Sequence, residues 1–397
     1  MERYVYFVRP VEIKVWGLTP KERILKVLGP RAQEIHDPAS APQGARVLIF
    51  RGDYIPEDRI INYLIDAPDT FLFVTEGKRQ VVVAASCSAE DAPLAAQVVE
   101  FRAKPGLLPG FSLHSPESLP LSVHHRLRKY ETPFVLPVRE GRVRQIEDRM
   151  FDWSYKGITD LVTKWLWPTP AKAAVRFCVR HGIRPNHVTI VSLILVIIAG
   201  WLFYKGQLGW GLLAGWIMTY LDTVDGKLAR VTVTSSKFGH YFDHLIDLIH
   251  PPIWYILWGM GTIAAGQYML QTPAGELYEK ILVWYIVGRL CEGAFKKLVA
   301  GFSIFCWRPV DSFFRLITAR RNPCLILLTI FWLGGRPDAG LYAVAIWTQV
   351  TSLFLLFRLI AGIVQKMRGT APKCWLEEIR GPEDGIPPLA KRWFVKG

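Results

Sequence analysis

Long apolar stretches in the second half of the chain constrain its fold more than any other feature. Six of them lie at 188–204, 209–231, 238–263, 278–299, 319–333 and 341–364. Each is near the roughly 20 apolar residues that a helix needs to cross about 30 Å of hydrocarbon. The fifth has the shortest uninterrupted apolar core. The pattern predicts an α-helical integral membrane domain with six transmembrane helices.

The first 152 residues have a different character. Short apolar runs at 4–8, 47–50, 71–74, 81–85 and 134–138 are typical of buried strands, and helical patterns at 20–28 and 56–64 lie among them. Thr19, Pro20 and Glu22 have the spacing of a capped helix start. The alternation predicts a cytoplasmic α/β domain at 1–152, a juxtamembrane amphipathic linker helix at 153–187, the membrane domain at 188–368 and a cytoplasmic tail at 369–397.

Charge and composition narrow the function classes. Lys and Arg number 48 against 34 Asp and Glu, a net charge of +14, and 51% of the residues are hydrophobic. This hydrophobicity excludes a disordered chain. Basic residues beside long apolar runs indicate the cytoplasmic face of a membrane rather than nucleic acid. The cations concentrate on one side of the expected spans, which predicts that both termini are cytoplasmic. Six Cys without a C-x-x-C pair favour a reducing compartment.

Carboxylates lie in or beside the second and third expected spans, where an unpaired one costs about 2.5 kcal/mol or more. They are Asp222, Asp225, Asp243 and Asp247. Their spacing puts the first two on one helix face and the last two on one face of the next helix. The short connection between the helices makes them neighbours. Converging carboxylates repel one another unless they hold cations, and hard oxygen ligands suit two Mg²⁺ or Mn²⁺ ions.

The residues around these carboxylates resemble a known pattern. Asp222-x-x-Asp225-Gly226-x-x-Ala229-Arg230, eight further residues and Gly239-x-x-x-Asp243-x-x-x-Asp247 resemble the complete signature of the CDP-alcohol phosphotransferase family. Pro185-Asn186-His187-Val188-Thr189 is similar to the segment that precedes the first span in that family. The resemblance covers roughly residues 153–368.

The resemblance implies a homodimer with a site that faces the cytoplasm. The family transfers a substituted phosphate from a CDP-linked alcohol to an acceptor hydroxyl and releases CMP, here in phospholipid biosynthesis. By resemblance, Asp222, Asp225 and Asp243 ligate two Mg²⁺ or Mn²⁺ ions, and Asp247 completes the metal site and acts as the catalytic base. The nucleotide-binding residues implied in the same way are Asn186, Thr189, Gly226, Ala229, Arg230 and Gly239. The expected partners are CDP-diacylglycerol or a CDP-polyol, an alcohol or polyol-phosphate acceptor and membrane lipid, without nucleic acid.

Several arginines lie inside or at the ends of apolar runs. They are Arg289, Arg315, Arg320, Arg321 and Arg358. Cations in membrane helices usually face the bundle interior and have a partner. We expect this group to bind the phosphate of the acceptor. The alternatives are salt bridges, such as one between Arg289 and Glu292, or side chains that reach up to the headgroups.

The N-terminal half has a weaker likeness to the sugar-nucleotide or cytidylyl transferase fold, carried by residues 16–23 and 47–54. It departs from that fold after the first strand, where Phe7-Val8-Arg9-Pro10-Val11 replaces the glycine-rich loop that would cradle a triphosphate. This favours a degenerate regulatory or docking domain. Two alternatives stay open: a bifunctional enzyme that also makes the CDP-alcohol from CTP, and a membrane transporter or scaffold with an acidic ion site.

Overall fold

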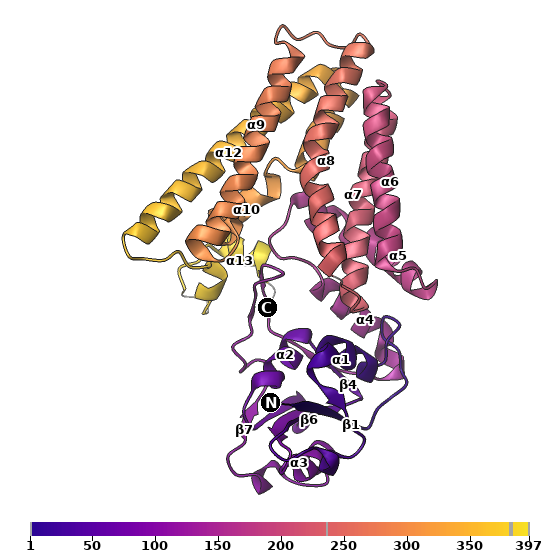
Figure 1. Ribbon diagram of the computed structural model, residues 1–397, viewed down its shortest axis with the longest axis vertical. Coiled ribbons are helices and arrows are strands. Elements are labelled where there is room, and N and C mark those ends of the chain that lie inside the picture. Colours follow the sequence, from indigo (N-terminus) through magenta and orange to yellow (C-terminus); the bar gives the residue numbers. More distant parts are fainter. Residues whose placement is uncertain (1, 236, 381–383, 396–397) are drawn as a thin grey trace.

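The computed structural model describes residues 2–235, 237–380 and 384–395, and it describes 237–244 by their backbone alone. Its two parts follow one another along the long axis of the molecule (Figure 1). One is an α/β part built from the first third of the chain. The other is a bundle of long helices. The expected change of character along the sequence is therefore a change of architecture.

The α/β part is built on a mixed sheet with the strand order β2-β1-β3-β6-β5-β7. Its strands are β1 Arg3–Val8, β2 Gln33–Glu34, β3 Arg46–Arg51, β5 Thr70–Glu76, β6 Arg79–Ser88 and β7 Ser112–His114. Strand β6 runs antiparallel to β3 and β5, and the other pairs are parallel. The longer strands lie where short apolar runs predict them. The edge strands β2 and β7 have no such run and were not expected.

Helices cover both faces of this sheet. Helices α1 (Pro20–Leu28) and α2 (Asp58–Asp66) pack their apolar sides on one face, and α3 (Ala92–Val99) packs on the other. The predicted capping box of α1 is present, because the Thr19 hydroxyl accepts the Glu22 N–H and the Glu22 carboxylate accepts the Thr19 N–H. Continuous apolar runs place apolar side chains on both faces of the sheet, which explains why the central strands β3 and β6 are largely buried.

Smaller elements lead from the sheet to the bundle. Strand β4 (Tyr54–Pro56) pairs with β10 (Val135–Pro137), and β8 (Val123–His124) forms a hairpin with β9 (Lys129–Tyr130). Helix α4 (Val143–Trp153) follows. The linker is not one helix: residues 154–161 are irregular, a π-helical turn η5 (Val162–Leu166) comes next, and α5 spans Pro168–Arg180. Pro168 and Pro170 start α5 in the way that prolines start helices.

The bundle helices coincide with the expected spans. They are α6 Pro185–Tyr204, α7 Leu208–Val231, α8 Lys237–Ala264, α9 Ala274–Ala294 with its π-helical extension η6 Phe295–Ala300, α11 Arg321–Leu333 and α12 Pro337–Met367. Helix α10 (Pro309–Ile317) precedes α11, and α13 (Pro388–Phe394) ends the tail. Within the described residues, α6 and α12 are long and apolar enough to cross a membrane, and the pair α10 and α11, bent by 46°, is a third candidate.

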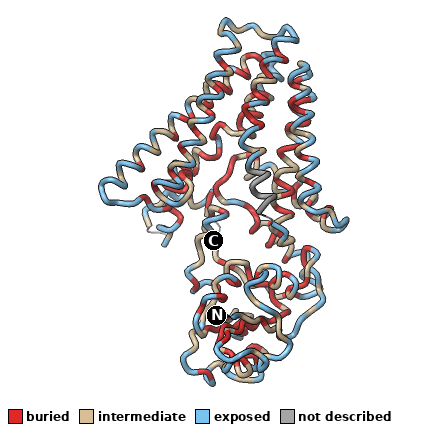
Figure 2. The backbone as a smooth tube through the Cα atoms, viewed as in Figure 1, coloured by how far each residue is buried: buried red, intermediate tan, exposed pale blue. Residues whose placement is uncertain are grey.

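Exposed residues lie along the outer faces of the bundle helices (Figure 2). Many of them are large apolar residues, which is the arrangement that lipid favours. On α6 these are Ile190, Ile194, Ile197 and Trp201, which share one face of the helix. The inner faces bury large aromatic side chains, including Trp254, Trp258 and Phe203. A bundle that is apolar both inside and outside leaves its polar groups as the informative exceptions.

Gly261 allows α8 to approach the end of α6. An added Cβ at Gly261 would lie 1.7 Å from the carbonyl oxygen of Phe203. We therefore expect Gly261→Ala to lower the free energy of unfolding in detergent by about 1–3 kcal/mol through overpacking.

Gly293→Ala is the matched control, because a Cβ at this position in α9 meets no described atom within 4 Å. This variant should be as stable as the parent or slightly more stable. Equal thermal unfolding temperatures for the two variants would contradict the close approach.

Candidate active site

Two carboxylates from neighbouring helices share one guanidinium. Asp222 lies on α7 and Asp247 on α8, and the Arg321 side chain at the start of α11 forms an ion pair with each. The Arg321 Nη1 to Asp247 Oδ1 distance is 2.5 Å, and the Arg321 side chain is 13% exposed. The structure thus brings together the acidic faces that helical spacing predicts, and it adds a cation from a third helix.

Asp225 faces the first bundle helix. It is 7% exposed, and its Oδ2 accepts a hydrogen bond of 2.7 Å from the Thr189 hydroxyl on α6. Asn186, one turn earlier, is exposed at the start of that helix. Of Asn186 and Thr189, which the resemblance implies in nucleotide binding, Thr189 is the one in direct contact with a motif carboxylate.

Asp243 and Gly239 lie on the first turns of α8, and their side chains fall outside the described residues. Among the side chains that are described, no group of three or more His, Cys, Asp or Glu is arranged to hold a metal ion. The donor chemistry nevertheless fits a hard cation, because Asp222, Asp225 and Asp247 offer carboxylate oxygens. Arg321 supplies positive charge between two of them, at the place where such oxygens need it.

The linker contacts the charged residues near the C-terminal end of α7. The Arg230 guanidinium donates a hydrogen bond of 3.0 Å to the Ser154 carbonyl, and the Lys227 ammonium lies 3.6 Å from the centre of the Tyr155 ring. A Cβ at Gly226 would lie 3.5 Å from Arg230 Nη2, and Ala229 is partly exposed beside it. Sequence reasoning missed Ser154, because a backbone carbonyl leaves no sequence signal.

The α/β part also contacts α7. Arg23 is 3% exposed and donates a hydrogen bond of 2.7 Å to the Val231 carbonyl at the end of this helix, while its other nitrogen lies 3.2 Å from Asp58. A cation at a helix C-terminus interacts favourably with the free carbonyls there. An apolar cluster that includes Trp16 and Leu228 continues this contact. The motif helix is therefore anchored to both halves of the chain.

Three of the expected acceptor-binding arginines gather around one carboxylate. Arg289 and Arg320 both form ion pairs with Glu292 on α9, the former at 2.8 Å. Arg315 on α10 lies over the Phe305 ring, 5.5 Å from its centre. Nitrogens of all three arginines are buried without a hydrogen-bond partner among the described residues. The expected Arg289–Glu292 salt bridge is thus present, but it leaves the cluster with excess positive charge.

The other two arginines lie elsewhere. Arg321 belongs with Asp222 and Asp247, as described above. Arg358 forms a bidentate ion pair with Asp311, at 2.6 and 2.7 Å, and stacks on Trp307 at 3.9 Å. Because two of its guanidinium nitrogens already bind a buried carboxylate, Arg358 fits the salt-bridge alternative better than an acceptor-binding role.

Apolar helices with exposed apolar faces, packed around an apolar core that holds a few charged groups, define the second half of the chain as a membrane domain. Residues 183–333 match the model of the CDP-alcohol phosphatidyltransferase family, so this segment is a domain of that family. The match includes both carboxylate helices and the arginine cluster, and it confirms the resemblance seen in the sequence.

Named relatives agree with this family. Archaetidylinositol phosphate synthase of Pyrococcus horikoshii is 42% identical over 69 residues, which cover 17% of this chain and 35% of that protein. Phosphatidylinositol phosphate synthase of Streptomyces avermitilis is 31% identical over 74 residues, which cover 18% of this chain and 30% of that protein. Its namesake in Mycobacteroides abscessus is 30% identical over 90 residues, 21% of this chain and 41% of that protein. The chain thus spans 30–41% of the length of these relatives.

Removal of Arg321 tests the shared ion pair. We expect Arg321→Met to lower the free energy of unfolding in EDTA by about 3–5 kcal/mol, because two partly buried carboxylates lose their common cation. Denaturant unfolding in detergent measures this loss.

Arg3→Met provides the comparison, since its partner Asp66 is 76% exposed and such surface pairs contribute less than about 1 kcal/mol. If Arg321→Met is no more destabilised than Arg3→Met, the ion pair does not hold the three helices together.

Proposed function

We propose that this protein transfers a substituted phosphate group from a CDP-linked alcohol to an acceptor hydroxyl and releases CMP in phospholipid biosynthesis. One observation carries the proposal: carboxylates of the family motif on α7 and α8 converge on Arg321, inside a segment that matches a CDP-alcohol phosphatidyltransferase domain. A transporter or scaffold has no need for the Gly, Ala and Arg residues that accompany these acids at fixed offsets.

The donor binds at the cytoplasmic end of α7. Arg230 can pair with phosphate oxygens, and the Ser154 carbonyl fixes its guanidinium in advance. Gly226 and Gly239 leave room beside the backbone, and Asn186, Thr189 and Ala229 complete the nucleotide pocket. Asp222, Asp225, Asp243 and Asp247 would hold two Mg²⁺ or Mn²⁺ ions, which would neutralise charge on the diphosphate and on the departing CMP. Thr189 orients the Asp225 carboxylate for this role.

Asp247 is the base of the reaction. It lies on the α8 face that meets α7, and Arg321 fixes one of its oxygens at 2.5 Å. A carboxylate held in this way can accept the proton of the acceptor hydroxyl as that oxygen attacks the phosphorus. The proton moves to Asp247, the new phosphodiester bond forms, and the bond to CMP breaks.

The acceptor is a polyol phosphate such as inositol phosphate. The buried arginine cluster of Arg289, Arg315 and Arg320 has unpartnered nitrogens, and a phosphate group satisfies such nitrogens with bidentate hydrogen bonds. The relatives are named as synthases of archaetidylinositol phosphate and phosphatidylinositol phosphate, and these names support the same acceptor class. Arg321 serves the carboxylates, and Arg358 serves Asp311, in this assignment.

The remaining proposals concern the context of the site. The bundle crosses the membrane with six helices, both termini are cytoplasmic, and the enzyme is a homodimer. The N-terminal half is a docking domain rather than a cytidylyltransferase. The contact of Arg23 with α7 supports docking. After β1, Pro10 packs so closely on Gly52 that a Cβ there would lie 2.5 Å from Pro10 Cα, which supports the absence of a phosphate-binding loop.

Replacement of the base tests the mechanism. We expect Asp247→Asn to reduce CMP release from CDP-diacylglycerol by at least about a thousandfold, because the amide cannot accept the proton. Binding of the CDP-alcohol, measured by isothermal titration, should persist. Turnover within a few-fold of the parent would remove the base assignment.

Metal removal tests the role of the carboxylates. EDTA should abolish CMP release, and added Mg²⁺ or Mn²⁺ should restore it. Asp225→Ala should weaken metal affinity, measured by titration with Mn²⁺, because an oxygen ligand is lost. Full turnover in EDTA, or unchanged Mn²⁺ affinity in this variant, would contradict the metal site.

A further inference from the structure

The arginine cluster carries more positive charge than the described carboxylates near it balance. Arg289 and Arg320 share Glu292. Arg315 is 8% exposed, and its Nε and Nη1 have no hydrogen-bond partner among the described residues. Asp160 of the linker lies near Arg315 but already accepts hydrogen bonds from Asn322 and Thr163. Uncompensated buried charge is costly, so the cluster is built to receive an anion.

A hairpin of the N-terminal half reaches this cluster through the linker. Arg128, in the turn between β8 and β9, has a φ of +50°, and its carbonyl accepts the Ile158 N–H at 3.1 Å. The neighbouring Leu127 carbonyl accepts the Gly157 N–H at 2.9 Å. A Cβ at Gly157 would lie 2.8 Å from the Arg128 carbonyl oxygen, so only glycine permits this approach. Hairpin and linker are locked together at this point.

Ile158, which binds the hairpin through its backbone N–H, packs its side chain against the membrane domain. Its side chain is fully buried in an apolar cluster with Phe305 and Trp307. The Phe305 ring also lies beneath Arg315 and Arg320, at 5.5 and 5.7 Å from its centre. The Arg128 charge is close enough to act on both of these arginines and on Glu292. The N-terminal half therefore adds a cation to a cluster that already has an excess of them.

Lys156 connects this cluster to the nucleotide end of the site. Its side chain reaches solvent, yet desolvation together with Arg128, Arg230 and Arg315 lowers the pKa of Lys156 to about 7, against the opposing effect of Asp222. It lies two residues after Ser154, which holds Arg230. The charge of Lys156 is therefore within electrostatic range of Arg230 in the proposed nucleotide pocket and of Arg315 in the arginine cluster.

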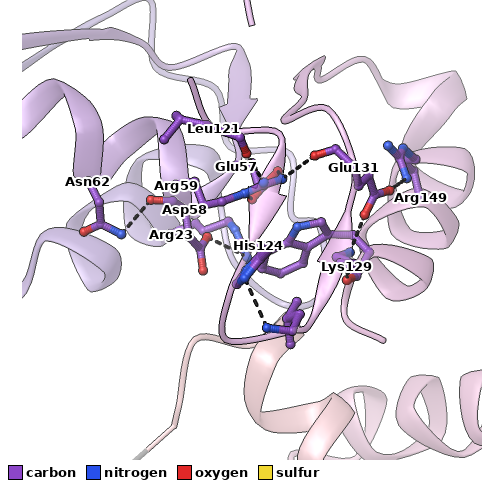
Figure 3. A network of polar contacts seen from close by, with 12 residues as sticks. Arg23, Glu57, Asp58, Arg59, Asn62, Leu121, His124, Lys129, Glu131 and Arg149 are labelled. Carbon is purple, nitrogen blue, oxygen red and sulfur yellow. Dashed lines mark hydrogen bonds and ion pairs between the residues drawn. The ribbon is translucent and has the colours of Figure 1, made fainter. Parts of the chain in front are cut away.

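A buried polar network keeps the hairpin rigid (Figure 3). Arg59 on α2 donates to the Leu121 and Glu131 carbonyls on either side of the hairpin. Lys129 pairs with Glu131 and donates to the Trp153 carbonyl at 2.5 Å. Burial, Arg59 and Lys129 lower the pKa of His124 to about 3, so its neutral ring can accept the Leu127 N–H, at 3.2 Å. The network fixes the turn that carries Arg128.

We propose that Arg128 and Lys156, two cations that lie outside the family match at residues 183–333, complete the binding site for the phosphate group of a polyol-phosphate acceptor. The proposal rests on the proposed function and adds to it that the N-terminal half forms part of the acceptor site. Such a site selects phosphorylated acceptors over neutral polyols, because the excess cations are left unpaired when the phosphate is missing.

The test uses the full-length protein in detergent with Arg128→Gln, Lys156→Gln and Arg128→Lys. Arg126→Gln is the matched control, because Arg126 lies in the same turn but is exposed. We expect the first two variants to raise the KM for inositol phosphate about tenfold or more, the usual effect of losing a charged hydrogen bond. The kcat, the KM for CDP-diacylglycerol and all constants of Arg126→Gln should stay near those of the parent, and Arg128→Lys should recover part of the loss.

Equilibrium titrations with inositol phosphate and with inorganic phosphate, without donor, separate this proposal from the reaction. Weaker binding in both variants supports the site even if the parent releases no CMP, in which case the proposed function fails alone. Unchanged acceptor KM and unchanged phosphate affinity overturn the site and leave the proposed function standing. Absence of any phosphate binding by the parent also overturns it. Inorganic phosphate that binds as tightly as inositol phosphate would show that the phosphate alone is recognised.

Discussion

Charged groups inside an apolar bundle must find partners, and this requirement organises the whole site. The guanidinium of Arg321 lies between Asp222 and Asp247 and thereby ties α11 to α7 and α8. Without a shared cation these carboxylates repel each other at close range in a medium of low polarity. The same rule accounts for Arg358, which pairs with both carboxylate oxygens of Asp311. It also makes the arginine cluster around Glu292 exceptional, since there the cations outnumber their partners.

The second constraint is that the site is not made by the bundle alone. The Ser154 carbonyl holds Arg230, the Tyr155 ring covers Lys227, and Arg23 binds the last carbonyl of α7. Together with a shared apolar cluster, these polar contacts connect the α/β part, the irregular linker and the motif helix. In the proposed function, a domain without a phosphate-binding loop can still serve the reaction, because it contacts the end of α7, the helix that carries Arg230, the side chain proposed to bind phosphate.

Tertiary contacts explain why the linker segment 154–161 is irregular rather than part of one continuous helix. A continuous amphipathic helix from 153 onward would turn most of its polar groups toward solvent or lipid. The irregular backbone instead offers the Ser154 carbonyl to Arg230 and pairs Gly157 and Ile158 with the β8–β9 turn. Glycine at 157 permits this contact, because a Cβ would meet the Lys129 side chain at 2.6 Å. Local helix propensity yields here to tertiary hydrogen bonds.

The sequence by itself determined the positions of the long bundle helices, the two-part organisation and the convergence of Asp222 with Asp247. Apolar length, period and the spacing of the motif depend only on local geometry, so they can be read along the chain. Apart from the i,i+3 pair of Arg289 and Glu292, the tertiary structure alone decided which cations meet which anions. Arg321 sits 99 residues from Asp222, and Arg23 sits 208 residues from Val231. No periodicity encodes such distances, because they follow from how whole helices pack against one another and against the α/β part.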